Sequence, residues 1–183
     1  MAVTAIVGAG ALAGALFGLT DKVDNVIQEL TLPLQHEDII RQQAREKDVD
    51  AALIAAVIYA ESKFSEDRTS PADARGLMQI QPQTALHLAK KSHATTFRVS
   101  DLSDPDINIR YGTYYLRDLL RQYGGNEVAA LAAYNAGQTN ADRWGGVGMS
   151  EDDIGFPETR AYVDEVLEKR GDYRKKYAKE LGY

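Results

Sequence analysis

The chain contains no cysteine, which excludes disulfide bonds, thiolate nucleophiles and thiolate metal ligands. It also lacks an excess of basic residues, because 21 Lys and Arg face 27 Asp and Glu and the formal net charge is -6. Such a chain has no electrostatic footprint for nucleic acid, and we expect no nucleic-acid partner. The three histidines, His36, His87 and His93, show no metal-ligand spacing. We therefore expect neither a metal nor a cofactor, and we discard a metal-dependent hydrolase.

Alternating polar and apolar runs long enough for a β-sheet are lacking too, and the sequence contains no internal repeat. Its 183 residues suffice for one domain with a sizeable core. Helical periodicity, caps and glycine stops predict an all-α domain over residues 37–183, preceded by a linker over residues 21–36. The residues between the predicted helices are interpreted as loops, including 65–73 and 138–156. The helices are expected at residues 37–47, 51–61, 82–91, 104–123, 126–135, 158–169 and 172–181.

The front of the chain has no charged residue between Ala2 and Leu19, a length that approaches the roughly 20 residues of a membrane-spanning helix. No Lys or Arg precedes this stretch and no clear cleavage site follows it, as a signal peptide would require. We expect residues 1–20 to form an uncleaved membrane anchor, with a cleaved signal peptide as the alternative. Glycines at positions 10, 14 and 18 would share one face of that helix and suit helix pairing, but we expect a monomer.

An acidic residue, Glu61, follows ten uncharged residues that are rich in Ala, Leu and Ile. That composition predicts a buried helix, which places Glu61 near its C-terminal end between Tyr59 and Phe64. Loss of water raises the pKa of such a carboxyl group, and the negative end of the helix dipole adds a smaller rise. A carboxyl group that stays protonated near neutral pH is suited to act as a general acid. On its own, however, a glutamate at this position is more often a solvated helix end.

Four motifs accompany this glutamate in a fixed order, and together they resemble the soluble-lytic-transglycosylase family, whose catalytic domain has a goose-lysozyme-like fold. The resemblance covers residues 37–177, and although each motif alone is weak, four in order are specific. They are the pair Glu61-Ser62, the GLMQ stretch at 76–79, the AYNAG stretch at 133–137 and the ETRAYV stretch at 158–163.

The resemblance implies a peptidoglycan lytic transglycosylase that acts outside the cytoplasm, in the cell envelope. Glu61 would protonate the glycosidic oxygen between N-acetylmuramic acid and N-acetylglucosamine, and the substrate's acetamido group would stabilise the charge at C1. The ionised glutamate would then remove the proton of the C6 hydroxyl, which closes a 1,6-anhydro ring without water. Most glycosidases need two carboxyl groups, but the acids nearest in sequence, Glu66, Asp67 and Asp73, belong to a polar loop.

The same resemblance implies a set of substrate-binding residues, each of which also has an ordinary structural explanation. Ser70 would bind near the acetamido group but equally suits a local turn. Asn135 is better suited to orienting backbone than to touching sugar, and Glu158 equally suits a helix start. Position 81 is a glutamine where related enzymes often carry methionine, which makes that part of the site more polar. The full set is Ser70, Gly76, Gln79, Gln81, Tyr134, Asn135, Glu158 and Tyr162.

Two other functions remain open from the sequence. A goose-type lysozyme would use the same scaffold for hydrolysis, and its products would differ from those of a transglycosylase. A non-catalytic glycan-binding wall protein would need no acid, and the presence of Glu61 argues against it.

Overall fold

Residues 31–183 are the part of the chain that the computed structural model describes. The expected membrane anchor, its glycine face and the first part of the expected linker lie outside these residues. Residues Gln35–Tyr183 form one compact unit. Within residues 31–183, no helix combines the length and the hydropathy needed to cross a membrane.

The unit is built from helices, and residues 31–183 contain no strand beyond two isolated bridges that join Thr69, Arg75 and Ile80. The predicted all-α class is therefore confirmed. The α-helices are α2 (Glu37–Lys47), α3 (Ala51–Ser62), α4 (Pro82–Lys91), α5 (Pro105–Gln122), α6 (Glu127–Ala136), α7 (Gln138–Arg143), α8 (Pro157–Lys176) and α9 (Ala178–Leu181). Three short 3₁₀ helices are η1 (Val99–Ser103), η2 (Gly146–Gly148) and η3 (Glu151–Asp153).

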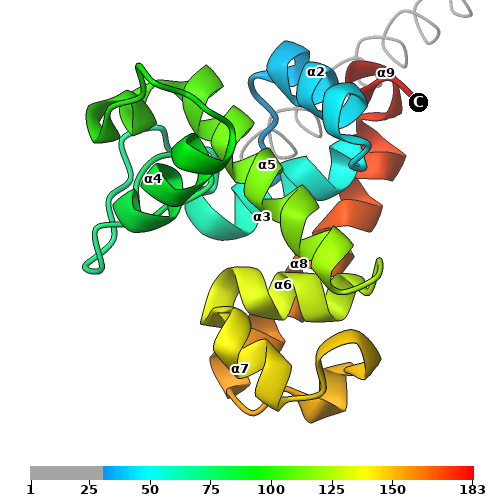
Figure 1. Cartoon of the computed structure of the whole chain (residues 1–183). Helices are drawn as coiled ribbons and strands as arrows, with labels where there is room; N and C mark the ends of the chain where they lie inside the picture. The colour runs from blue at the N-terminus through cyan, green and yellow to red at the C-terminus, as the bar shows by residue number, and fades with distance from the viewer. Residues whose placement is uncertain (1–30) are drawn as a thin grey trace, which may run out of the picture. The chain divides into compact units, whose positions relative to one another are not determined.

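Helix α3 forms the centre of the core. Residues 51–58 are all buried, as the uncharged run predicts, and α3 packs chiefly against α8. The Asp50 side chain begins the helix by accepting a hydrogen bond from the Ala52 amide at 3.0 Å, the interaction expected of an N-cap. In Figure 1 the C-terminal half of α8 runs alongside α3, and α9 lies next to α2. This packing fixes the end of α3, and with it the position of Glu61.

Helix α5 links the two sides of the unit. Asp104 caps it by accepting from the amides of Asp106 and Ile107 at 2.9 and 3.1 Å, and positive φ angles at Gly124 and Gly125 follow its end. In Figure 1 α4 lies to one side of α5, while α6 and α7 lie below it. A site that lies beside α5 can therefore be lined by residues of α4 as well as by residues of α6.

Two parts of the predicted helix pattern are wrong. Helix α8 runs without a break through Gly171, where two helices were expected. A glycine inside a helix costs only about 1 kcal/mol, and buried Val166 and Tyr173 on either side of it hold both halves in the core.

The segment 138–156, expected to be a loop, contains α7, η2 and η3. Helix α7 begins after Gly137, whose φ of 86° turns the chain at the end of α6. Its six residues are too few to show apolar periodicity. Buried Ala141 and the edge-to-face rings of Trp144 and Phe156, with centroids 4.9 Å apart, hold this segment in place.

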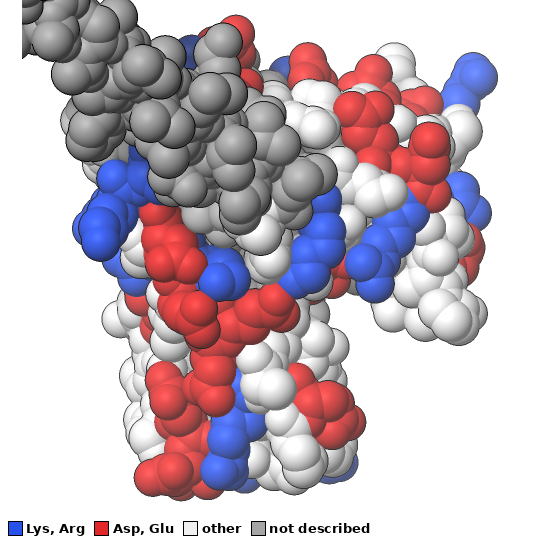
Figure 2. All heavy atoms as spheres, turned by 180° about the vertical axis from the view of Figure 1, so that it is seen from behind, with Lys and Arg blue, Asp and Glu red and all other residues white. Residues whose placement is uncertain are grey.

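The charged side chains are mixed in sign over the face opposite that of Figure 1. Figure 2 shows Lys and Arg interspersed among Asp and Glu on the described part of this face. Mixed charges of this kind largely cancel at a distance. The binding of a charged ligand therefore depends on the charged residues close to its site more than on the field of the whole unit.

Candidate active site

Glu61 is the next-to-last residue of α3 and is half-buried. Burial removes water from its carboxyl group and raises the pKa from 4.5 to about 7. The Tyr162 hydroxyl and the positive charge of Arg68 offset part of this rise. The expected effect of desolvation is thus present, and a pKa near neutrality lets Glu61 both hold and release a proton at neutral pH.

An open hollow of about 530 Å³ lies beside this carboxyl group. Among the residues that line it, Glu61 is the single acid and Arg68 the single base. Helices α3, α4, α5, α6 and α8 and the segment 68–81 all contribute to the wall. The lining residues are Ala60, Glu61, Arg68, Ser70, Ala74, Gln79, Ile80, Gln81, Thr84, Tyr115, Tyr134, Asn135, Ala136, Gly137 and Tyr162.

Two tyrosines that line the hollow, Tyr134 and Tyr162, lie close enough to Glu61 to feel its charge, and burial raises the pKa of both well above the usual value of 10. The Tyr134 hydroxyl donates a hydrogen bond to the Met78 carbonyl at 2.8 Å. The Tyr162 hydroxyl is buried without a hydrogen bond of normal geometry in residues 31–183, and Glu61 is the charged group that acts on it most. Tyr134 therefore supports the wall, while Tyr162 has an O–H group free for the acid or for a ligand.

The segment 68–81 folds back on itself beside Glu61. The Gln79 amide nitrogen donates to the carbonyls of Arg68 and Gly76 at 2.9 and 2.8 Å. The Ser70 hydroxyl oxygen accepts from the amides of Ala72 and Ala74 at 3.2 and 3.1 Å, which is the local turn foreseen as its structural role. Both residues line the hollow, and these hydrogen bonds do not use the Gln79 side-chain oxygen or the Ser70 O–H.

The buried side chain of Asn108, on α5, holds this segment in place through three hydrogen bonds. Asn108 is 1% exposed; its nitrogen donates to the carbonyls of Arg75 and Leu102 at 2.8 and 2.9 Å, and its oxygen accepts from the Met78 amide at 2.8 Å. Gly76 has a φ of 71°, and a Cβ atom there would lie 2.3 Å from the Asn108 nitrogen. Gly76 is thus buried and does not line the hollow, and the close approach that requires glycine is to Asn108.

Seven of the nine predicted site residues line the hollow: Glu61, Ser70, Gln79, Gln81, Tyr134, Asn135 and Tyr162. Asn135 is exposed, and its side-chain oxygen accepts from the Thr159 hydroxyl at 2.8 Å. Glu158 is exposed in the first turn of α8 and does not line the hollow. For Glu158 and Gly76, a role toward a glycan stays a prediction.

None of the other acids near Glu61 in sequence, Glu66, Asp67 and Asp73, lines the hollow, and two of them have partners elsewhere. A Glu66 carboxylate oxygen lies 2.9 Å from the His36 imidazole nitrogen, and Asp73 accepts from Arg75 at 2.9 and 3.1 Å. No group of three or more His, Asp or Glu residues within 31–183 is arranged to hold a metal ion. The hollow offers one carboxyl group for proton transfer.

Comparison with known proteins places the chain in a family. The family model described as the transglycosylase SLT domain matches residues 38–155, which is more than half of the chain. The chain belongs to the transglycosylase SLT family. This confirms the resemblance that the four motifs indicate.

Relatives of this SLT domain agree in sequence and in fold. The soluble lytic murein transglycosylase of Salmonella typhimurium is 36% identical over 154 residues, which cover 80% of this chain and 24% of that protein. The membrane-bound lytic murein transglycosylase C of Edwardsiella ictaluri is 36% identical over 110 residues, or 55% of this chain and 30% of that protein. The crystal structure of the 70-kDa soluble lytic transglycosylase of Escherichia coli matches with a TM-score of 0.76 and 33% identity, over 84% of this chain and 26% of that one. The chain thus spans about a quarter of the length of the soluble relatives, and the lysozyme-like fold is confirmed.

The sequence carries little signal for three further residues of this SLT domain. Arg68 stands in a polar loop where an arginine is unremarkable, and Tyr115 lies on a helix with other tyrosines. The rings of Tyr115 and Tyr134 approach with centroids 5.2 Å apart, which requires α5 and α6 to be packed. Asn108 is a polar residue within an apolar helix pattern. This irregularity is the one feature of the sequence that indicates a buried, hydrogen-bonded side chain.

Proposed function

We propose that the chain is the catalytic domain of a lytic transglycosylase that cleaves the bond between N-acetylmuramic acid and N-acetylglucosamine in peptidoglycan. The observation that carries the proposal is a single carboxyl group, with a pKa of about 7, on the wall of an open hollow that contains no second acid. The names of the relatives, which are murein transglycosylases, support the same substrate class.

The proposed reaction uses Glu61 twice. Protonated Glu61 donates its proton to the glycosidic oxygen, and the bond from that oxygen to C1 of N-acetylmuramic acid breaks. Because the hollow holds no carboxylate to stabilise the positive charge at C1, the acetamido group of the substrate fills this role. The ionised Glu61 then accepts the proton of the C6 hydroxyl, whose oxygen bonds to C1 and closes the 1,6-anhydro ring.

The residues around Glu61 have distinct parts in this scheme. The Tyr162 hydroxyl and the Arg68 guanidinium stabilise the carboxylate once it has lost its proton. Ser70 and Gln79, which line the hollow, bind the acetamido group and other polar groups of the sugars. Gln81 and Asn135 lie exposed on the wall and extend the polar surface along the strand.

We place the domain in the cell envelope, outside the cytoplasm, where peptidoglycan is found. The proposal includes attachment to the cytoplasmic membrane through residues 1–20, with a cleaved signal as the alternative, and a monomeric state. Fractionation of cells, followed by carbonate extraction of the membranes, tests the attachment.

The reaction type is tested by the mass of the products. Digestion of isolated peptidoglycan should yield muropeptides that end in 1,6-anhydro-N-acetylmuramic acid, each lighter by one water than a hydrolysis product. Reducing ends in place of anhydro ends would identify a goose-type hydrolase, and an absence of any cleavage would favour a glycan-binding protein.

The role of Glu61 is tested by Glu61→Gln, which keeps the shape of the side chain and removes the acid. We expect kcat to fall by about 10²–10⁴-fold, the usual contribution of general acid–base catalysis. The matched control is Glu66→Gln, an exposed acid of the adjacent loop, which should retain activity. Full activity in Glu61→Gln would refute the catalytic assignment.

A further inference from the structure

Arg68 is the one basic residue that lines the Glu61 hollow, and its side chain is exposed. Its positive charge lowers the pKa of Glu61, so the guanidinium lies on the same side of the hollow as the acid. The proposed reaction uses this charge only to stabilise the Glu61 carboxylate. The guanidinium has five N–H donors, which leaves open what else it binds.

The backbone of Arg68 is fixed to the wall of the hollow. Its carbonyl oxygen accepts from the Gly76 amide and from the Gln79 side-chain nitrogen, each at 2.9 Å. The next residue, Thr69, forms an isolated bridge with Arg75. The Arg68 side chain therefore begins at a fixed point, while its exposed end is free to adjust to a ligand.

The Arg68 guanidinium makes no hydrogen bond or ion pair within residues 31–183. The nearby acids of its own loop have other partners, because Glu66 lies against His36 and Asp73 pairs with Arg75. An arginine binds a carboxylate through two parallel hydrogen bonds, and such charge-assisted bonds are stronger than neutral ones. An unpaired guanidinium on a polar wall therefore favours a ligand that carries a carboxylate there.

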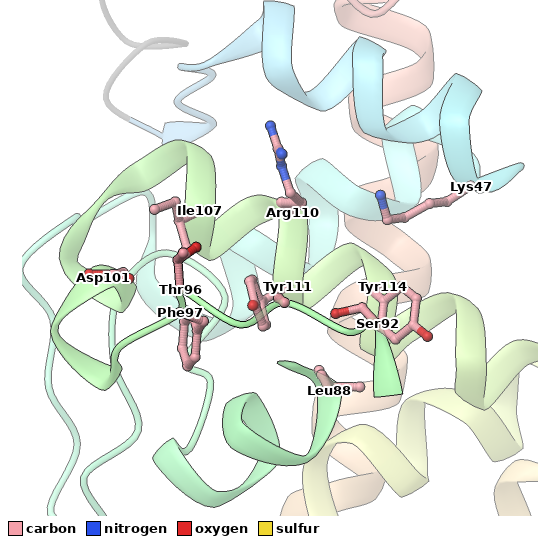
Figure 3. A pocket seen from close by; sticks show the side chains of 11 residues that line it. Lys47, Leu88, Ser92, Thr96, Phe97, Asp101, Ile107, Arg110, Tyr111 and Tyr114 are labelled. Atoms are coloured by element: carbon pink, nitrogen blue, oxygen red, sulfur yellow. The ribbon is translucent and has the colours of Figure 1, made fainter. Parts of the chain in front are cut away.

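Another exposed arginine provides a comparison. Arg110 lines a second hollow, of about 390 Å³, which shares no lining residue with the Glu61 hollow. In Figure 3 its side chain extends toward α2 and away from Leu88 and Tyr111. Like Arg68, it makes no hydrogen bond or ion pair within the described residues 31–183. Arg110 is thus a similar exposed charge that lies outside the Glu61 hollow.

The sugars of the proposed substrate contain one group that can be anionic. Hydroxyl and acetamido groups are neutral, but the lactyl group on C3 of N-acetylmuramic acid ends in a carboxyl group. This carboxyl group is a neutral amide where a peptide is attached, and a free carboxylate where the peptide has been removed. A cation in the Glu61 hollow therefore distinguishes the two forms of the strand.

The order of groups along the wall matches the order of substituents on this sugar. In the proposed reaction Glu61 acts at C1, and Ser70 binds the acetamido group on C2. The lactyl group is on C3, the next ring atom. Arg68 is two residues before Ser70 in the same segment, and its charge acts on Glu61. The guanidinium is therefore close to both positions that orient the sugar.

We propose that Arg68 binds the free lactyl carboxylate of N-acetylmuramic acid, so that the domain prefers glycan strands without peptides. The inference rests on the proposed function and adds to it a substrate form and a residue that selects this form. A hydrolytic reaction that breaks the amide bond between lactyl group and peptide must then supply the substrate.

The kinetic test compares two forms of one polymer. Strands stripped of peptides by an amidase carry lactyl carboxylates, and carbodiimide coupling with methylamine converts these groups to neutral methylamides. For the unaltered chain we expect KM to be about 3–10-fold lower on the carboxylate form, as for one charge-assisted contact. Arg68→Gln should show equal KM on both forms, and Arg68→Lys should keep part of the preference.

The matched control is Arg110→Gln, the same charge change at an exposed arginine of the second hollow, which should keep the full preference. Because Arg68 also acts on Glu61, its loss changes kcat on both forms, and the ratio of the two KM values is the decisive quantity. Equal KM for the unaltered chain, or a preference that persists in Arg68→Gln, would overturn the proposal. Cleavage of neither form by the unaltered chain would contradict the proposed function instead, and binding then decides the inference.

The binding test uses a disaccharide of N-acetylglucosamine linked to a terminal N-acetylmuramic acid, which lacks the bond that is cleaved. The chain is titrated with this disaccharide and with its lactyl methylamide, and the NMR signals of Arg68, Ser70 and Gln79 are followed. We expect saturable shifts at these residues, with about 3–10-fold weaker binding of the methylamide and no such difference for Arg68→Gln. Equal binding of the two sugars to the unaltered chain, no binding, or shifts confined to the second hollow would show that Arg68 does not bind the carboxylate.

Discussion

The Glu61 carboxyl group sets the requirements of catalysis against those of stability. Desolvation at the end of α3 raises its pKa from 4.5 to about 7, which keeps part of the population ready to donate a proton. The same desolvation makes the ionised form costly in the folded state. At this position the best residue for the proposed reaction is therefore not the best residue for the fold.

This conflict predicts a pH-dependent stability difference between the unaltered chain and Glu61→Gln. Between pH 4.5 and 7 the folded chain holds the Glu61 proton more firmly than the unfolded chain, so the free energy of unfolding falls as pH rises. Glutamine does not ionise and escapes this loss. We expect Glu61→Gln to be more stable by about 1–3 kcal/mol at pH 8 and similar in stability at pH 4.

Urea unfolding at the two pH values measures this difference. Asp67→Asn, at an exposed position in the neighbouring loop, should change stability by less than about 0.5 kcal/mol at both pH values. A Glu61→Gln variant that gains nothing between pH 4 and pH 8 would show that the carboxyl group is solvated in the folded chain.

The elements follow the sequence closely where local chemistry decides them. Asp50, Asp104 and Asn126 each cap a helix at the place where a short polar side chain precedes an apolar pattern. Two helices could not be predicted in this way, and each for a physical reason. The continuity of α8 through Gly171 depends on core packing that no local pattern displays. The six residues of α7 carry no periodicity at all.

The candidate site shows the same division. Glu61, Tyr134 and Tyr162 are found in motifs, and the structure brings them to one hollow. Asn108 is not, because its role arises only when α5 packs beneath the segment 75–80. A contact between distant elements has no signature in either element alone, so such supporting residues escape prediction from one sequence.

The support from α5 predicts that Asn108→Ala damages both fold and site. The change leaves the Met78 amide and the carbonyls of Arg75 and Leu102 without their partner. We expect a loss of about 2–3 kcal/mol in the free energy of unfolding. We also expect kcat/KM to fall at least about tenfold. The segment that carries Gln79, and the Met78 carbonyl that accepts from Tyr134, would no longer be held in place by Asn108.

The control for this change is Gln122→Ala at the exposed C-terminal end of α5, which should alter neither quantity. Urea unfolding and the rate of release of anhydromuropeptides measure the two effects. If Asn108→Ala had the same free energy of unfolding and the same rate of product release as the unaltered chain, the segment 75–80 would not depend on the Asn108 side chain.

At the scale of the whole unit, one carboxylate joins parts of the chain that are far apart in sequence. Asp50 caps α3, accepts from Arg170 at 2.7 Å and from Arg174 at 3.0 Å on α8, and accepts from the hydroxyl of Tyr183. Arg170 also pairs with Glu127 at the start of α6. These contacts hold the N-terminal end of α3 against α8, opposite to the end that carries Glu61.

The last prediction concerns this junction. Burial alone would raise the pKa of Asp50, but the hydrogen bonds from Tyr183 and Arg170 outweigh it and hold the pKa below 3.8. A depressed pKa contributes stability above the unfolded pKa and loses it as pH falls through the folded value. Asp50→Asn keeps the cap but removes the charge opposite two arginines. We expect it to cost about 1–3 kcal/mol at pH 7 and less at pH 3.

Asp48→Asn is the matched control, because Asp48 is exposed in a left-handed conformation that asparagine tolerates well. It should change stability by less than about 0.5 kcal/mol at either pH. Thermal and urea unfolding at pH 7 and pH 3 separate the two variants. An equal cost for Asp50→Asn at both pH values would mean that the carboxylate acts through its shape alone. A pH-dependent cost would show that the charge of Asp50 holds α3 to α8, and thereby fixes the helix that presents Glu61.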